Sequence, residues 1–145
     1  MSSPAKVKRL VSDEVIEELL SLTPRWSTQA FMGYQVWHCL PALGPLARAM
    51  FDKWNGAFMV RVPPGGRLLK HTDDAKPYVS YHLPIATNDK ALSLFEVDGS
   101  EVAIHLDRGV LYEYDRTIPH WAVNCGDTDR VHLVCEIFLL SERAS

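Results

Sequence analysis

The chain has 145 residues and a net charge of -3, and it is 47% hydrophobic and 23% charged. These values are ordinary for a globular protein and predict a single domain over residues 1–145. The lysines and arginines are scattered along the chain. Nucleic acid is therefore not the expected partner, because phosphate binding requires concentrated positive charge.

Neither a secretory signal nor a membrane span is expected from the sequence. The N-terminal stretch MSSPAKVKRLVSDE lacks an apolar run, and no segment approaches the ~20 apolar residues of a spanning helix. The three cysteines, Cys39, Cys125 and Cys135, form no CxxC pair and are odd in number, which argues against a disulfide framework. We therefore expect a reduced protein of the cytoplasm.

Short helices are predicted in an N-terminal part, residues 1–56. Residues 12–22 begin with a capping serine and two acidic residues and continue with apolar residues at helical spacing. A second helix is predicted from Pro45 to Trp54, since proline is tolerated at the first helical position. The basic residues of the stretch KVKR are expected to form a solvated tail.

From residue 57 the pattern changes to β-strands, which we expect to form a core over residues 57–140. Turn residues such as PPGG, TNDK and DGS separate the apolar runs, and no helical pattern lies between them. Short strands at this even spacing predict an all-β sandwich or barrel. Eight strands are expected, at residues 57–62, 67–71, 78–85, 92–97, 101–106, 110–115, 120–124 and 131–140.

Two HxD pairs are candidates for metal binding. Residues two apart share a strand face, so His71 and Asp73 should point together while Asp74 points away. Two imidazoles and one carboxylate form a facial triad, which leaves three positions of an octahedral Fe(II) open. A distal histidine, His120, completes this set with the first pair. The second pair, His105 and Asp107, ends at a turn close before His120, and we expect it to be structural.

An arginine follows the distal histidine after one turn. Arg130 lies ten residues beyond His120, so an antiparallel strand would return it towards that histidine. A guanidinium near a metal suits a carboxylate, which it holds with two parallel hydrogen bonds.

These motifs together resemble the aspartyl/asparaginyl β-hydroxylase family of Fe(II)/2-oxoglutarate dioxygenases, whose relatives include the free-proline hydroxylases. The likeness covers about residues 58–140. It includes the turn in PPGGRLLKH before the first metal histidine, a histidine eleven residues later in YHLPI, and the pair Tyr114-Asp115 before the distal histidine.

The resemblance implies a double-stranded β-helix, a jelly-roll of the cupin kind. It implies that Fe(II) is bound by His71, Asp73 and His120, that Arg130 binds the distal carboxylate of 2-oxoglutarate, and that His82 supports the cosubstrate. The activity implied is hydroxylation of an unactivated C–H bond by dioxygen, with succinate and CO2 as co-products. The expected substrate is an amino acid, a peptide side chain or a related small molecule.

Two other functions stay open from the sequence. A cupin with these ligands is also compatible with a non-redox metal enzyme, such as an isomerase or epimerase, or with a jelly-roll binding module that has no activity.

Arg116 stands where the family often has an acidic residue, and we expect it on the surface.

Overall fold

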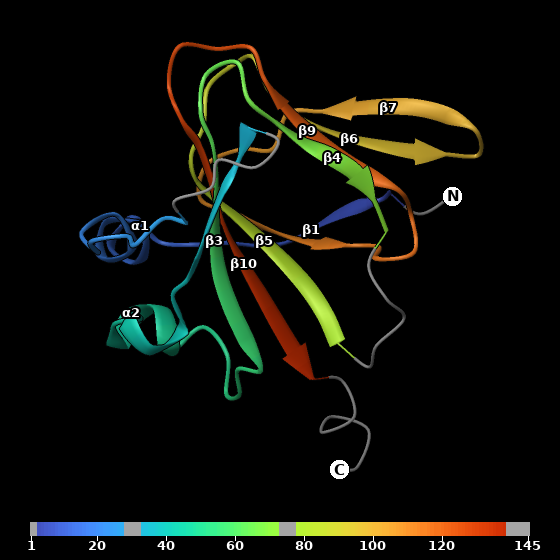
Figure 1. Ribbon diagram of the computed structural model, residues 1–145. Helices are drawn as coiled ribbons and strands as arrows, with labels where there is room; N and C mark the ends of the chain where they lie inside the picture. The colour runs from blue at the N-terminus through green and yellow to red at the C-terminus, as the bar shows by residue number, and fades with distance from the viewer. Residues whose placement is uncertain (1–2, 28–32, 73–77, 139–145) are drawn as a thin grey trace.

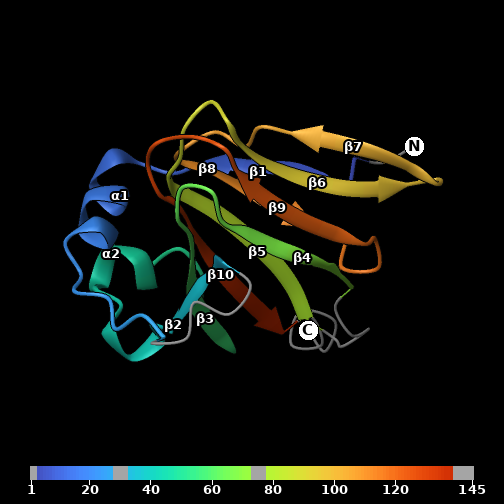
Figure 2. The same cartoon turned by 45° about the horizontal axis from the view of Figure 1, so that its top comes forward.

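The computed structural model of the protein describes residues 3–27, 33–72 and 78–138. The strands form two antiparallel sheets that lie face to face as two layers (Figures 1 and 2). This arrangement confirms the predicted jelly-roll with short N-terminal helices.

The larger sheet has six strands. Their order across the sheet is β1 (Ala5–Leu10), β8 (Val110–Tyr114), β5 (Tyr78–Ala86), β10 (Arg130–Phe138), β3 (Gly56–Val62) and β2 (Gln35–His38). The smaller sheet has four strands, in the order β4 (Arg67–His71), β9 (His120–Asn124), β6 (Ala91–Val97) and β7 (Ser100–Ile104).

The eight strands predicted from residue 57 onward are present in the described part of the chain, with small shifts at their ends. The pattern missed two edge strands in the N-terminal part. The basic stretch expected to be a tail forms β1, which pairs with β8. This pairing places Nζ of Lys8 3.4 Å from Oε1 of Glu113. Strand β2 pairs with β3. Both are edge strands whose pairing depends on partners distant in sequence, so local periodicity alone did not reveal them.

The helices cover one face of the larger sheet (Figure 1). Helix α1 (Asp13–Leu20) starts at the predicted cap, where the Ser12 side chain accepts a hydrogen bond from the Val15 N–H. Its buried residues, Ile16 and Leu19, pack into the main apolar core. A short 3-10 helix, η2 (Leu40–Ala42), leads towards the second α-helix.

Helix α2 (Pro45–Arg48) is shorter than predicted. The Glu18 carboxylate accepts hydrogen bonds from the N–H groups of Leu46 and Ala47 at its start, at 3.0 and 2.9 Å. At its end the Trp54 indole donates to the Arg48 carbonyl at 3.1 Å. The indole satisfies a terminal carbonyl and turns the chain back towards β3, so the helix does not extend to residue 54.

Strand alternation in β10 divides its side chains between two environments. Val131, Leu133 and Cys135 point into the core beneath the helices. Arg130 and His132 point the other way and line a cavity between the sheets. The fold therefore places polar side chains of the larger sheet opposite the smaller one.

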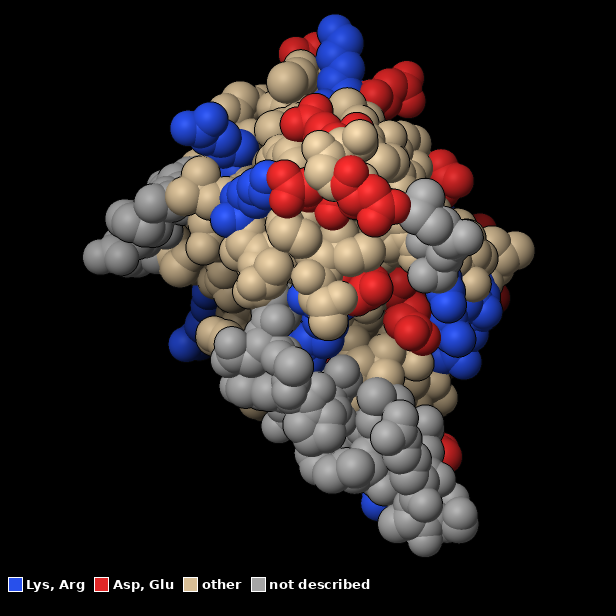
Figure 3. Space-filling model, turned by 90° about the vertical axis from the view of Figure 1, so that its right-hand side faces the viewer, with Lys and Arg blue, Asp and Glu red and all other residues tan. Residues whose placement is uncertain are grey.

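No helix in the described ranges is long and apolar enough to cross a membrane. The face of the molecule shown in Figure 3 carries acidic and basic side chains side by side.

Candidate active site

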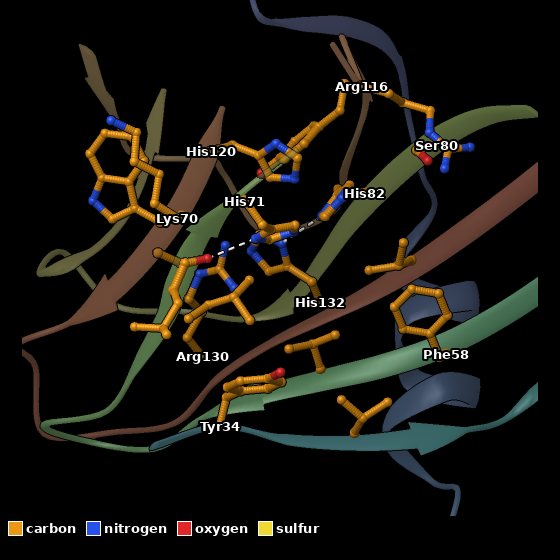
Figure 4. A pocket seen from close by; sticks show the side chains of 18 of the residues that line it. Tyr34, Phe58, Lys70, His71, Ser80, His82, Arg116, His120, Arg130 and His132 are labelled. Carbon is orange, nitrogen blue, oxygen red and sulfur yellow. Dashed lines mark hydrogen bonds between the residues drawn. The ribbon is translucent and has the colours of Figure 1, made fainter. Parts of the chain in front are cut away.

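A cavity of about 510 Å³ lies between the two sheets (Figure 4). The larger sheet gives it an apolar wall, formed by Val36, Phe58, Val60 and Val134, with Tyr34 beside them. Volumes of this size are typical of small-molecule sites with a few convergent polar groups. The polar side chains of this cavity come from both sheets.

Two histidines meet on the smaller sheet. His71 at the end of β4 pairs directly with His120 at the start of β9, and their ring centroids are 4.4 Å apart. Each Nδ1 lies close to the backbone carbonyl two residues earlier, at 2.7 Å for His71 with Leu69 and 2.9 Å for His120 with Ile118. A carbonyl only accepts, so each Nδ1 carries the proton and each Nε2 carries the lone pair. This is the tautomer in which a histidine binds a metal through Nε2.

The third predicted metal ligand, Asp73, lies outside the described residues, as does Asp74. Among the described residues no group of three His, Cys, Asp or Glu side chains could hold a metal. Two ligands of the predicted set are thus brought together, and their tautomers fit a metal site. The carboxylate stays a prediction from the sequence.

Arg130 is 4% exposed and spans the two sheets. Its guanidinium donates a hydrogen bond to the Ser93 hydroxyl on β6 at 2.8 Å, and the Tyr114 hydroxyl donates to the same oxygen at 3.3 Å. Burial lowers the pKa of Arg130. No carboxylate forms an ion pair with it within the described ranges. A buried cation that lines a cavity without an acidic partner is suited to an anionic ligand.

His82 lies beside Arg130 in the same cavity. Its ring stacks on Tyr114, with centroids 3.6 Å apart and an angle of 7° between the planes. Its Nδ1 is 3.4 Å from Nδ1 of His132 on the neighbouring strand β10. Burial, and then the positive charge of Arg130, lower the pKa of both histidines well below the ordinary value. Both rings are therefore neutral near pH 7.

The predicted site residues did not include His132 or Arg116, which also line the cavity. His132 lies two residues after Arg130, and the strand face that the two residues share was a signal for the site. Arg116, expected on the surface, is half-buried and lines the cavity. The second HxD pair does not line the cavity. Nε2 of His105 lies 3.8 Å from Oδ1 of Asp107, and Nδ1 of His105 is 3.3 Å from the Ala91 carbonyl oxygen.

A family model for aspartyl/asparaginyl β-hydroxylases matches residues 20–138, most of the chain. The protein belongs to the aspartyl/asparaginyl β-hydroxylase family. It is therefore an enzyme of the 2-oxoglutarate-dependent dioxygenase class. No curated protein matches it significantly.

Solved structures show that this family member has the fold of 2-oxoglutarate oxygenases. HygX from Streptomyces hygroscopicus, crystallised with nickel, 2-oxoglutarate and hygromycin B, aligns with a TM-score of 0.75 at 11% identity, over 92% of this chain and 82% of HygX. A prolyl-4-hydroxylase from Pseudomonas putida aligns with a TM-score of 0.68 at 15% identity, over 93% of this chain and 92% of that one. An oxidoreductase of the 2OG-Fe(II) oxygenase family from Burkholderia pseudomallei aligns with a TM-score of 0.69 at 11% identity, over 92% and 83%. At these identities the likeness concerns the fold.

Proposed function

We propose that this β-hydroxylase family member is an Fe(II)- and 2-oxoglutarate-dependent hydroxylase of a free amino acid, a peptide side chain or a related small molecule. The observation that carries the proposal is the pair His71 and His120 with Arg130 in one cavity. A metal ligand pair and a buried cation for a carboxylate are the two elements that binding of 2-oxoglutarate requires.

The metal would be held by His71, Asp73 and His120. In the two histidines the proton on Nδ1 is bound by a backbone carbonyl, so the ring orientation is fixed before any metal arrives. Fe(II) with 2-oxoglutarate and dioxygen supplies the oxidation, in which one oxygen atom enters the substrate C–H bond and the other enters succinate, with release of CO2. The protein binds, orients and shields these groups.

Arg130 would bind the far carboxylate of 2-oxoglutarate. Its guanidinium is already oriented by Ser93, and the surrounding cavity wall is largely apolar, so the charge-assisted hydrogen bonds form away from water. His82 would bind the other carboxylate. A non-redox metal enzyme that binds no 2-oxoglutarate would not require a buried guanidinium at this place. Arg130 therefore favours the oxygenase.

The rest of the cavity would receive the substrate. Phe58, Val36 and Tyr34 provide apolar and aromatic surface, and Arg116 adds a polar group to the lining. This combination suits a small molecule or a single side chain with both apolar and polar parts.

The first test is an anaerobic titration of the apoprotein with Fe(II) and 2-oxoglutarate, followed by visible absorption. A weak charge-transfer band that requires both additions is expected, because the keto acid then chelates iron inside the protein. His120→Ala should abolish the band, and His105→Ala is the matched control that should keep it. Iron binding without any band on addition of 2-oxoglutarate would contradict the proposal and favour a non-redox metal enzyme. Succinate release would then identify substrates from a panel of amino acids and peptides.

A further inference from the structure

The contact between His82 and His132 has a consequence for ligand binding. The two residues lie on neighbouring strands, β5 and β10, and both point into the cavity between the sheets. Figure 4 shows the two rings joined by a dashed line, which marks the 3.4 Å contact between their Nδ1 atoms. The rings are nearly perpendicular, at 81°. Because the two Nδ1 atoms lie within hydrogen-bond distance, one of them must donate and the other must accept.

Only two proton arrangements are compatible with this contact in a pair of neutral rings. A neutral imidazole has one N–H donor and one acceptor nitrogen. Two N–H groups facing each other would clash, and two lone pairs would repel. If His132 donates from Nδ1, the proton of His82 is on Nε2. If His82 donates from Nδ1, its Nε2 carries a lone pair. The tautomer of one ring therefore fixes the tautomer of the other.

The position of His82 decides which arrangement a carboxylate ligand needs. Its ring is held by stacking on Tyr114, and the structure gives its Nε2 no hydrogen bond within the described ranges. A carboxylate is only an acceptor, so it can bind His82 only through an Nε2–H group. An Nε2 lone pair would instead repel the anion that Arg130 attracts.

We propose that His132 is a positioning residue, whose Nδ1–H donates to Nδ1 of His82 and thereby holds His82 in the Nε2–H tautomer that a carboxylate of 2-oxoglutarate requires. The inference rests on the proposed function for the identity of the carboxylate. The coupling of the two rings depends only on their contact. His132 itself need not touch the cosubstrate.

Two substitutions of His132 separate this role from simple packing. The amide nitrogen of asparagine is two bonds from Cβ, as Nδ1 is in histidine, so His132→Asn keeps a donor facing His82. The amide of glutamine is three bonds from Cβ, as Nε2 is, so His132→Gln keeps polarity and size but removes the donor from that place. Both variants replace an imidazole by an amide, and each is the matched control of the other.

The first measurement is ¹⁵N NMR of histidine-labelled protein, which distinguishes a protonated ring nitrogen from one with a lone pair. In the wild-type protein, with and without Zn(II) and 2-oxoglutarate, we expect the proton of His82 on Nε2. His132→Asn should keep this state, and His132→Gln should lose it. A proton on Nδ1 of His82 in the wild-type complex would overturn the inference.

The second measurement is the affinity for 2-oxoglutarate with Zn(II) bound. His132→Gln should weaken it by about tenfold or more, since a hydrogen bond to a charged group is lost, while His132→Asn should stay within about threefold of the wild type. Zn(II) affinity should not change in either variant. Equal loss in both variants would show a packing role and contradict the inference.

Failure of the proposed function has a different signature. If the wild-type protein binds no 2-oxoglutarate, the proposed function and the role in carboxylate binding both fail. The tautomer of His82 in the ligand-free protein still decides whether the two rings are coupled. A melting curve of each variant tests whether the fold is retained.

Discussion

In the variant Arg130→Met, an apolar side chain of similar length replaces a buried guanidinium. Arg130 is 4% exposed, burial lowers its pKa, and its guanidinium donates a hydrogen bond to the neutral Ser93 hydroxyl. The cost of removing a charge from water, several kcal/mol per ion, is thus offset by few contacts. After the substitution, Ser93 keeps the Tyr114 hydroxyl as its partner at 3.3 Å, so no buried hydroxyl is left unsatisfied.

We therefore expect Arg130→Met to retain or raise the free energy of unfolding, by about 1–3 kcal/mol in the absence of ligands. In a domain of this size each kcal/mol raises the melting temperature by about 2–4 °C. The affinity for 2-oxoglutarate should fall by about 2–5 kcal/mol, which is a factor of about 30 to 5000, because one partner of a buried charge pair is lost. Iron affinity should change little, since the guanidinium is not a metal ligand.

Urea unfolding of the apoprotein and calorimetric titration with 2-oxoglutarate measure these two effects separately. Arg130→Lys is the matched control, since it keeps the buried charge but loses the two parallel hydrogen bonds. It should weaken 2-oxoglutarate binding without any gain in stability. A loss of more than about 1 kcal/mol of stability in Arg130→Met would show that the guanidinium mainly holds the two sheets together. That result, with unchanged affinity for 2-oxoglutarate, would refute the reasoning.

Three further predictions concern the metal ligands and the pH dependence of stability. Asp73→Ala should abolish Fe(II) binding in an equilibrium titration while Asp74→Ala leaves it nearly unchanged, and equal effects would contradict the strand alternation of the HxD pair. His105→Ala should bind Fe(II) as the wild type does, and loss of binding would mean that the wrong HxD pair was chosen. Burial and Arg130 lower the pKa of His82 and of His132, so the unfolded chain gains protons below about pH 6.5 while the native rings stay neutral. Their contribution to stability is therefore present above about pH 6.5, and it decreases by about 1.4 kcal/mol per pH unit for each histidine as the pH falls towards the lowered native values. Urea unfolding at about pH 7 and pH 5.5 measures this loss of stability. The variant His132→Asn should lose about half as much unfolding free energy per pH unit as the pH dependence of both histidines gives. An unchanged pH dependence would show that His132 is protonated in the native state.

Sequence by itself determined the strands and the candidate metal ligands. Alternating apolar residues and Gly, Pro, Asn and Asp turns are local signals, since a strand exposes every second residue to one face. They predicted eight strands from residue 57 onward. Motif spacing, together with the family resemblance, selected His71, His82, His120 and Arg130, which the structure brings to one cavity.

Only the tertiary structure decided how these residues meet. His71 and His120 are 49 positions apart, and the register of β4 with β9 makes them direct neighbours. Ser93, which orients Arg130, lies on the opposite sheet, and His132 contacts His82 on the neighbouring strand. Edge strands β1 and β2 likewise depend on distant partners. Such contacts are made between segments far apart in the chain, and no local periodicity encodes which of them will pair. Because a strand fixes only the direction of its own side chains, the site itself is a property of the packed sheets.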